Sequence, residues 1–455
     1  MKALILLSSL GVIALLAEIF SFKKLLYPIV LLGLITTFVL NIFDWDTNKL
    51  YFKMVQFDNY AVAFSAVIIV IAFLWFIMAE GFFKEESNQT DYFTLVLFSL
   101  VGAVIMVSYS NMAMLFLGIE ILSIPMYILA GSNKTDVSSN EAAFKYLIMG
   151  AFATGFLLFG IALIYGATGS FDLAGIAAAV TNGSAVSSIF YVGVLLMLVG
   201  MAFKVSAAPF HFWAPDVYQG APTVITAFMA TIVKTAAFAA FLRLFSTTFM
   251  SVSGTWMHVV WVMAALTLLV GNITAVMQTS TKRMLAYSSV AHAGYMLLAL
   301  LAGNSYSNSA ILFYAAAYSI GSIATFSIVN IISKSKGTDT VDSFNGLGKS
   351  NPLLAVVMTI ALLSLAGIPP TAGFFAKYYI FTSAFVAGNV SLVLIAIIAS
   401  LIGVYYYFRI IIAMFFKHSS DETIAVESNH KLLLIVIAIA IIALGLMPDC
   451  IISLL

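Results

Sequence analysis

The sequence predicts an all-α, polytopic membrane protein. Of 455 residues, 63% are hydrophobic and 9% are charged, whereas soluble domains carry roughly 25% charged residues. Fourteen long apolar stretches can be marked, each near the ~20 residues that cross the hydrocarbon layer. Such stretches satisfy their backbone hydrogen bonds in lipid only as helices, and a barrel would show ten-residue alternation instead. We therefore expect a single membrane domain, residues 1–455, of about 14 transmembrane helices.

The expected helices follow one another with connections too short for a separate soluble domain. The first could pass for a signal peptide, but it lacks an obvious small-residue cleavage site and thirteen more spans follow, so it counts as a helix. In chain order the stretches are Leu4–Phe20, Leu25–Ile42, Tyr60–Phe83, Tyr92–Tyr109, Met112–Ala130, Ala142–Tyr165, Ile189–Phe212, Val224–Phe245, Trp256–Val276, Met284–Ala302, Ala310–Ile332, Leu353–Ala384, Leu392–Phe416 and Leu432–Leu454.

The basic residues predict the orientation of these helices. When the connections are numbered alternately, twelve lysines and arginines fall on one side and four on the other, the four being Lys2, Lys49, Lys53 and Arg243. Loops rich in lysine and arginine stay in the cytoplasm. Both termini should therefore lie on the extracytoplasmic side, and the uneven split also supports an even number of spans.

Composition also restricts cofactors and partners. The single cysteine, Cys450, excludes an intrachain disulfide and a cysteine-held iron–sulfur cluster within this chain. No Gly-rich phosphate loop can be recognised, so we expect neither a redox cofactor nor a nucleotide here. The net charge of +1 gives no indication of a nucleic-acid partner.

Ionisable residues inside the apolar spans are the main functional signal. Glu120, Lys204, Lys234 and Lys377 fall within spans, and Lys145 and Lys282 lie near the ends of theirs. Each such charge costs at least ~2.5–3.5 kcal/mol to insert, so a set of six favours function over packing. Any single one of these residues has two alternative explanations: a lysine whose amine reaches the membrane interface, or a charge pair that fixes helix register. These alternatives apply above all to Lys145 and Lys282.

Lysine suits proton transfer at such positions. Desolvation lowers the pKa of an amine toward neutrality, where it can take up and give off a proton, while a nearby carboxylate acts in the opposite direction. A change in the pairing of Glu120 with Lys204 would therefore alter the proton affinity of that lysine. His211 and His292 could add relay steps, although a lone histidine is as often a hydrogen-bonded core residue.

Two spans should be interrupted near a lysine. Pro209 follows Lys204 in the seventh span, and Pro369 and Pro370 precede Lys377 in the twelfth. Proline removes a backbone donor and clashes with the preceding turn. Non-helical backbone at membrane depth persists only where it is buried in protein or lines water, and interrupted helices at matching positions indicate an ion site. A proline kink that only improves packing is the alternative.

A weak internal repeat links the two interrupted spans. Gly150–Thr154 resembles Gly321–Thr325 at an offset of 171 residues, Glu120 and His292 are 172 apart, and Lys204 and Lys377 are 173 apart. The offset covers five helices, an odd number, so the second copy should run in the opposite sense through the membrane. We expect a three-helix prefix at 1–88, a first five-helix repeat at 89–250, a second, inverted one at 251–420 and a last helix at 421–455.

Five stretches carry a resemblance to a known family. They are Leu117–Ser123 (LGIEILS), Glu141–Tyr146 (EAAFKY), Phe203–Pro222 (FKVSAAPFHFWAPDVYQGAP), Lys282–Tyr295 (KRMLAYSSVAHAGY) and Leu365–Lys377 (LAGIPPTAGFFAK). Over nearly its whole length the chain resembles the antiporter-like membrane subunits of bacterial NADH-quinone oxidoreductase, respiratory complex I, and within that family the subunit N branch.

The resemblance implies roles for residues already singled out. Glu120 and Lys204 resemble the paired carboxylate and lysine of a half-channel, Lys234 the connecting lysine and Lys377 the terminal relay residue. The supporting polar positions of the family are matched by Lys145, His211, Lys282 and His292.

The resemblance also implies an assembly and a place. FMN, iron–sulfur clusters and quinone would lie on partner subunits, with other membrane and peripheral subunits of the complex, the lipid bilayer and protons as partners. The chain would be a multi-pass protein of the bacterial inner membrane. Two other readings remain: a subunit of a multi-subunit cation/proton antiporter, and a structural subunit whose buried charges only fix helix register.

Overall fold

The chain is an all-α bundle, as the composition predicts. The computed structural model describes residues 1–85, 89–181, 187–304, 306–418 and 423–455. The predicted domain limits at residues 88 and 420–421 lie outside these ranges, and the division into repeats stays a prediction. The first part of the chain forms α1 (Lys2–Ile19), α2 (Lys23–Ile42), β1 (Lys49–Tyr51), β2 (Val55–Phe57), α3 (Asn59–Met78), α4 (Glu80–Glu85), α5 (Gln89–Ser108), α6 (Met112–Ala130), α7 (Val137–Thr168), α8 (Leu173–Thr181), α9 (Ser188–Lys204) and α10 (Trp213–Gly220).

The remaining elements continue the bundle to the C-terminus. They are α11 (Thr223–Phe228), η1 (Met229–Val233), α12 (Lys234–Arg243), η2 (Leu244–Thr248), η3 (Met250–Val252), α13 (Ser253–Val276), α14 (Thr281–Ala302), α15 (Ser307–Lys336), η4 (Val341–Phe344), α16 (Leu347–Ser350), α17 (Pro352–Ala366), α18 (Ala372–Val386), α19 (Val390–Phe416), α20 (Ser428–Leu446) and α21 (Asp449–Ile452). Among the described residues the only sheet is the antiparallel hairpin of β1 and β2, which the sequence analysis did not foresee.

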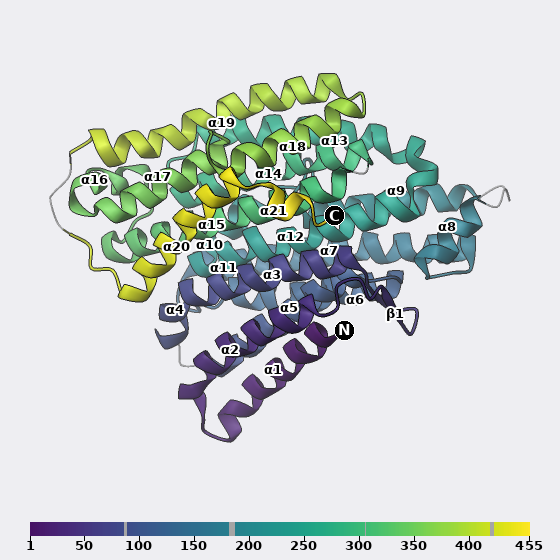
Figure 1. Ribbon diagram of the computed structural model, residues 1–455, viewed down its shortest axis with the longest axis horizontal. Helices are drawn as coiled ribbons and strands as arrows, with labels where there is room; N and C mark the ends of the chain where they lie inside the picture. Colours follow the sequence, from purple (N-terminus) through teal and green to yellow (C-terminus); the bar gives the residue numbers. More distant parts are fainter. Residues whose placement is uncertain (86–88, 182–186, 305, 419–422) are drawn as a thin grey trace.

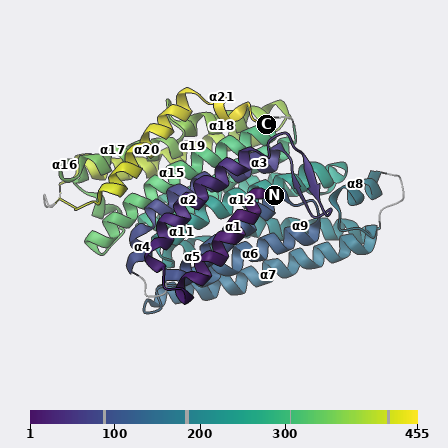
Figure 2. The same ribbon diagram turned by 60° about the horizontal axis from the view of Figure 1, so that its bottom comes forward.

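Twelve helical segments of the described chain are long and apolar enough to cross a membrane, and α9 and α17 are shorter apolar helices. Together they account for the fourteen expected spans. Figure 1 shows the long helices running roughly side by side, with α1 and α2 at one edge of the bundle and α19 at the opposite edge. In the view of Figure 2, α7 runs along the lower edge of the molecule.

Burial divides the bundle into central and outer helices. The hydrophobic windows of α15 and of the continuous run Thr223–Thr248 are wholly buried, and that of α14 nearly so. Those of α1, α2 and α20 are about one-third buried. Side chains on the outer helices therefore face lipid or neighbouring subunits, whereas a polar group on a central helix must find its partner inside the protein.

Both predicted interruptions are present, and they shorten the expected spans. The seventh span ends as a helix at Lys204 rather than Phe212, and residues 205–212 turn irregularly before α10. The twelfth is two helices, α17 and α18, separated by residues 367–371. Lys204 thus precedes its break and Lys377 follows its own, as the positions of the prolines predicted.

A third irregularity was not expected. The eighth span contains two π-helical segments, η1 directly before Lys234 and η2 directly after Arg243. A π-turn holds an extra residue, changes the direction of the side chains that follow, and is frequent at functional sites. Both segments lack proline, so no sequence signal marked them.

Candidate proton pathway

Lys204 is buried between α6 and the end of α9. Its amine donates hydrogen bonds to Ser123 Oγ at 2.9 Å and to Tyr127 Oη at 3.3 Å, both on α6. As the last residue of α9, Lys204 also lies at the negative end of the helix dipole, which stabilises a cation there. Helix termination therefore positions this amine.

Glu120 lies one helical turn before Ser123 on α6 and is only half-buried. Its carboxylate accepts a 2.9 Å hydrogen bond from Thr154 Oγ1 on α7. In this conformation no ion pair within 4 Å joins Glu120 to Lys204 in the described part of the chain, so their functional pairing stays a prediction. The two groups share one face of α6, because residues three apart are neighbours on a helix.

Lys234 is deep in the centre of the bundle, 2% exposed. Its amine donates to the main-chain oxygen of Ser289 at 2.6 Å and to Ser289 Oγ at 2.5 Å. Ser289 is on α14, so the contact links the first and second predicted repeats. The π-turn η1 ends at the residue before Lys234 and sets the direction of this side chain.

The next polar groups lie along α14. Ser288 shares a short hydrogen bond with the hydroxyl of Tyr407 on α19. That hydroxyl lies 3.2 Å from His292 Nε2, and His292 Nδ1 lies 2.6 Å from the hydroxyl of Tyr314 on α15. His292 is 4% exposed. A ring hydrogen-bonded through both nitrogens can pass a proton between them, so His292 occupies a relay position.

Lys377 is held by the break that precedes it. Its amine donates to the main-chain oxygen of Ala366, the last residue of α17, and to Ser400 Oγ, each at 2.7 Å. It also lies 4.9 Å from the centre of the Tyr295 ring. The hydroxyl of Tyr295 accepts a 3.4 Å hydrogen bond from Asn272, whose side-chain oxygen accepts one from Tyr406 at 3.2 Å.

These contacts form a polar trail through the second half of the molecule. It runs from Lys234 to Ser289, then from the next residue, Ser288, to Tyr407. From the adjacent Tyr406 it continues through Asn272 to Tyr295, whose ring lies beside the Lys377 amine. Serine and tyrosine hydroxyls both donate and accept, so each hydroxyl of the trail can take up a proton from one neighbour and give one to another. In the ranges that the structure describes, no hydrogen bond leads from Lys204 or its partners Ser123 and Tyr127 onward to Lys234.

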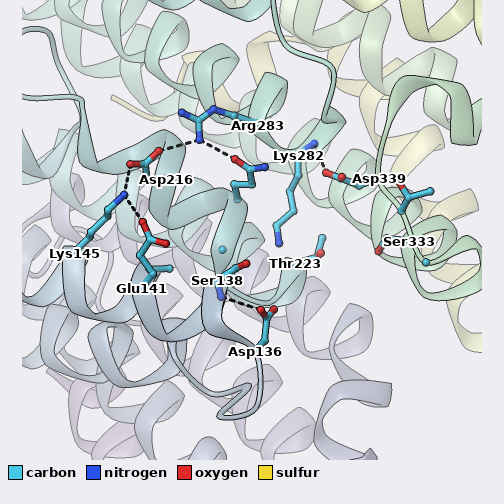
Figure 3. A pocket seen from close by; sticks show the side chains of 15 residues that line it. Asp136, Ser138, Glu141, Lys145, Asp216, Thr223, Lys282, Arg283, Ser333 and Asp339 are labelled. Carbon is cyan, nitrogen blue, oxygen red and sulfur yellow. Dashed lines mark hydrogen bonds and ion pairs between the residues drawn. The ribbon is translucent and has the colours of Figure 1, made fainter.

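Lys145 and Lys282 line a pocket of about 640 Å³ at one end of the bundle. Figure 3 shows the Lys145 amine between Glu141 and Asp216, 2.7 Å from a carboxylate oxygen of each. The Lys282 amine donates to the main-chain oxygen of Ala221 at 2.5 Å. The side chains of Lys145 and Lys282 thus lie at one end of the helix bundle rather than at its centre, which agrees with their positions near the ends of their spans.

Asp216 forms ion pairs with two basic residues in this pocket, Lys145 and Arg283. The sequence analysis did not single it out as a site residue. Arg283 donates to it at 2.9 Å, opposite Lys145. Burial alone would raise the pKa of this carboxyl, but the hydrogen bonds from Lys145 and Arg283 outweigh burial and hold the pKa below its usual value. Asp216 therefore ties α10 to both α7 and α14. The only signal for it was its place in the Phe203–Pro222 motif.

His211 lies in the irregular stretch after α9, buried against the Phe212 ring at 4.4 Å between ring centres. Its Nδ1 has no hydrogen-bond partner among the described residues. The structure does not bring His211 into contact with Lys204, Lys234 or His292.

Comparison with known sequences and structures assigns the chain to a family. Residues 109–403 match the model of the family described as NADH:quinone oxidoreductase/Mrp antiporter, TM. A relative from Cytophaga hutchinsonii, the NADH-quinone oxidoreductase subunit N, is 47% identical over 99% of this chain and 98% of its own length.

Solved structures agree with this assignment. A chain in the respiratory complex I of Thermus thermophilus superposes with a TM-score of 0.85 at 32% identity, over 99% of this chain and 98% of that one. A chain of the Mrp complex from Dietzia sp. has the same fold, with a TM-score of 0.88 at 21% identity over 100% of this chain and 95% of that one. The chain therefore belongs to the subunit N family of the NADH-quinone oxidoreductases, within the NADH:quinone oxidoreductase/Mrp antiporter family.

Proposed function

We propose that this chain, as a membrane subunit of an NADH-quinone oxidoreductase, moves protons along Glu120, Lys204, Lys234, His292 and Lys377. The observation that carries the proposal is the polar trail from Lys234 to Lys377, all of whose side chains are buried in the bundle. Within the described ranges no carboxylate lies within 4 Å of the Lys204, Lys234 or Lys377 amines. Amines bound only by neutral groups in a dry interior can change protonation without breaking an ion pair.

The separation of Glu120 from Lys204 supports a switch between them. Glu120 is bound to Thr154 while Lys204 is bound to Ser123 and Tyr127. A movement that brought the carboxylate to the amine would favour the charged lysine, and its withdrawal would favour proton release to the next group. Direct contact between Glu120 and Lys204 would then belong to another stage of the cycle.

The remaining parts of the proposal concern the assembly. We infer that FMN, iron–sulfur clusters and the quinone site belong to partner subunits. Quinone reduction there would drive proton transfer in this chain through conformational and electrostatic coupling, without a redox reaction in the chain itself. The face carrying Lys145, Lys282 and Arg283 is cytoplasmic, both termini are extracytoplasmic, and the membrane is the inner membrane of a bacterium.

The test uses the whole complex, reconstituted into vesicles. Lys204→Met and Lys234→Met keep much of each side chain's volume and remove the amine; Lys134→Met, at an exposed loop position, is the matched control. We expect both core variants to assemble, with fewer protons moved per electron, and the control to behave as the parent protein. A structural role for these lysines predicts the reverse: poor assembly, with normal pumping by the complex that does assemble.

The same vesicles separate this function from a cation/proton antiporter. Proton movement that requires electron transfer to quinone, at any sodium concentration, supports the proposal. Exchange of sodium for protons without electron transfer would instead assign the chain to the antiporter class.

A further inference from the structure

A second cavity lies at the opposite end of the bundle from the Asp216 pocket. It has a volume of about 340 Å³ and opens among the connections between α2 and α3, α5 and α6, α7 and α9, and α12 and α13. By the charge distribution of the loops this end is extracytoplasmic. Its wall includes the ion pair Arg243–Asp58, together with Tyr109, Ser110 and Asp172.

Arg243 is held in this wall by an ion pair and a ring contact, but one of its nitrogens lacks a hydrogen-bond partner among the described residues. It is 8% exposed, donates to Asp58 Oδ1 at 2.6 Å, and lies over the Tyr60 ring at 4.8 Å. Its Nε has no hydrogen-bond partner in the described protein, and neither has the buried Ser110 Oγ. Two buried polar atoms without protein partners, beside a cavity that exceeds the ~30 Å³ share of one water many times over, indicate that water occupies this site.

The cavity is connected by side chains to the helix that carries Lys234. The Tyr109 hydroxyl donates to the main-chain oxygen of Ala240 at 2.9 Å, and Tyr60 donates to that of Ala239 at 2.8 Å. Both carbonyls belong to α12, which begins at Lys234 and ends at Arg243, about 13 Å apart along the helix axis. The π-turns η1 and η2 flank this helix, one at each of these two residues.

We propose that this cavity is the water-filled site from which protons leave the chain, and that the Arg243–Asp58 pair controls the barrier to their release. The inference rests on the proposed function. In the release step a proton that leaves the polar trail passes to the water in the cavity and from there to bulk water, and the group that gave it up loses one positive charge. A proton crossing the wall meets the positive Arg243, whose repulsion is reduced only while Asp58 neutralises it.

The first experiment measures hydration of the cavity. Cys450, the sole cysteine, is changed to serine, and Ser110→Cys is introduced and exposed to a small membrane-impermeant thiosulfonate in the intact complex. Ser65→Cys is the control, since Ser65 is a wholly buried residue of α3 away from the cavities. Modification is read from the mass of the isolated chain. We expect Ser110→Cys to react about tenfold faster or more, because thiolate exposure governs the rate, and only from the extracytoplasmic side. Equal, slow rates would overturn the inference.

The second experiment measures the barrier. Asp58→Asn preserves the N-cap that Asp58 gives to α3, since asparagine caps as well as aspartate, but leaves Arg243 unneutralised. We expect fewer protons per electron in Asp58→Asn and recovery in the double variant with Arg243→Gln, which removes both charges. If the pair only fastens α3 to α12, the double variant will pump no better than the single one.

A reference variant keeps this inference separate from the proposed function. If Lys234→Met impairs pumping while Asp58→Asn pumps normally, the release site is refuted and the proposed function stands. If Lys234→Met also pumps normally, the proposed function itself fails. Thiol labelling does not depend on pumping, so its result is informative in either case.

Discussion

The side-chain amine of Lys377 donates a 2.7 Å hydrogen bond to the main-chain oxygen of Ala366, the last residue of α17. A carbonyl at a helix C-terminus has no partner within its own helix. The interruption of the twelfth span therefore supplies an acceptor for the lysine at membrane depth. The helix break thus provides a hydrogen-bond acceptor for the buried amine, and the amine satisfies a carbonyl that the break leaves without a partner in its own helix.

Gly367 allows this contact, and its replacement should destroy it. Its φ is +82°, and a Cβ there would lie 2.7 Å from the Lys377 side chain. We predict that Gly367→Ala costs about 1–2 kcal/mol from the backbone alone, and also displaces Lys377 and reduces pumping. Gly388 is the matched control, because its φ is +84° but a Cβ there would contact nothing. Gly388→Ala should lower the thermal stability of the complex without affecting protons moved per electron. Equal pumping by both variants would contradict the assigned role of Lys377.

Tyr407 joins Ser288 to His292, so its hydroxyl should matter more than its ring. Tyr407→Phe removes both links at a cost of about 1 kcal/mol for each lost hydrogen bond, and we predict a pumping rate lower by about fivefold or more. Tyr405→Phe, next in sequence but 60% exposed, is the control and should have no effect. The measurement is initial proton uptake by vesicles at equal electron flux. A normal rate in Tyr407→Phe would remove this tyrosine from the pathway.

The Asp216 ion pairs should make part of the stability depend on pH. Because the pKa of Asp216 is depressed in the folded protein, its contribution is complete above the ordinary carboxyl pKa near 4 and is lost as the pH falls through the lower folded pKa. Asp216→Asn should therefore lower the free energy of unfolding at neutral pH by about 1 kcal/mol or less for each partly exposed pair, and the melting temperature should fall with it.

The difference between parent and variant should narrow only in strong acid. Melting temperatures of the detergent-solubilised complex across this range are the measurement. A constant difference at every pH would show that charge on Asp216 is not its source.

The orientation of the chain can be tested at its one cysteine. Cys450 is exposed, near the C-terminus. If the basic loops are cytoplasmic, a membrane-impermeant maleimide should label Cys450 from the extracytoplasmic side, and Cys450→Ser should abolish labelling of this chain. Labelling only from the cytoplasmic side would reverse the assigned orientation, and with it the direction of the release site.

Most of the fold was predictable because lipid imposes strict demands. Apolar runs of this length must be helices, and proline in the Pro209 and Pro369–Pro370 motifs marked both interruptions. The hairpin at 49–57 was missed because short strands outside the membrane carry no comparable constraint. The π-turns beside Lys234 and Arg243 were missed because they involve no proline and depend on packing.

The site was predictable as a set of residue types but not as a set of contacts. A charge in an apolar run is costly wherever it points, so Lys204, Lys234 and Lys377 were evident from the sequence. Their partners Ser123, Ser289 and Ser400 were not, because serine is common in membrane helices and costs little to bury. Asp216 was overlooked for a related reason: outside a span, a carboxylate looks like any loop residue.

The sequence by itself determined that this is a multi-span helical protein with ionisable groups in its interior, because insertion into hydrocarbon depends on residues one span at a time. Only the tertiary structure decided that Glu120 and Lys204 bind different partners, and that Lys234 and Lys377 share one polar trail. Those facts depend on which helix faces meet, and that follows from packing among segments far apart in the chain.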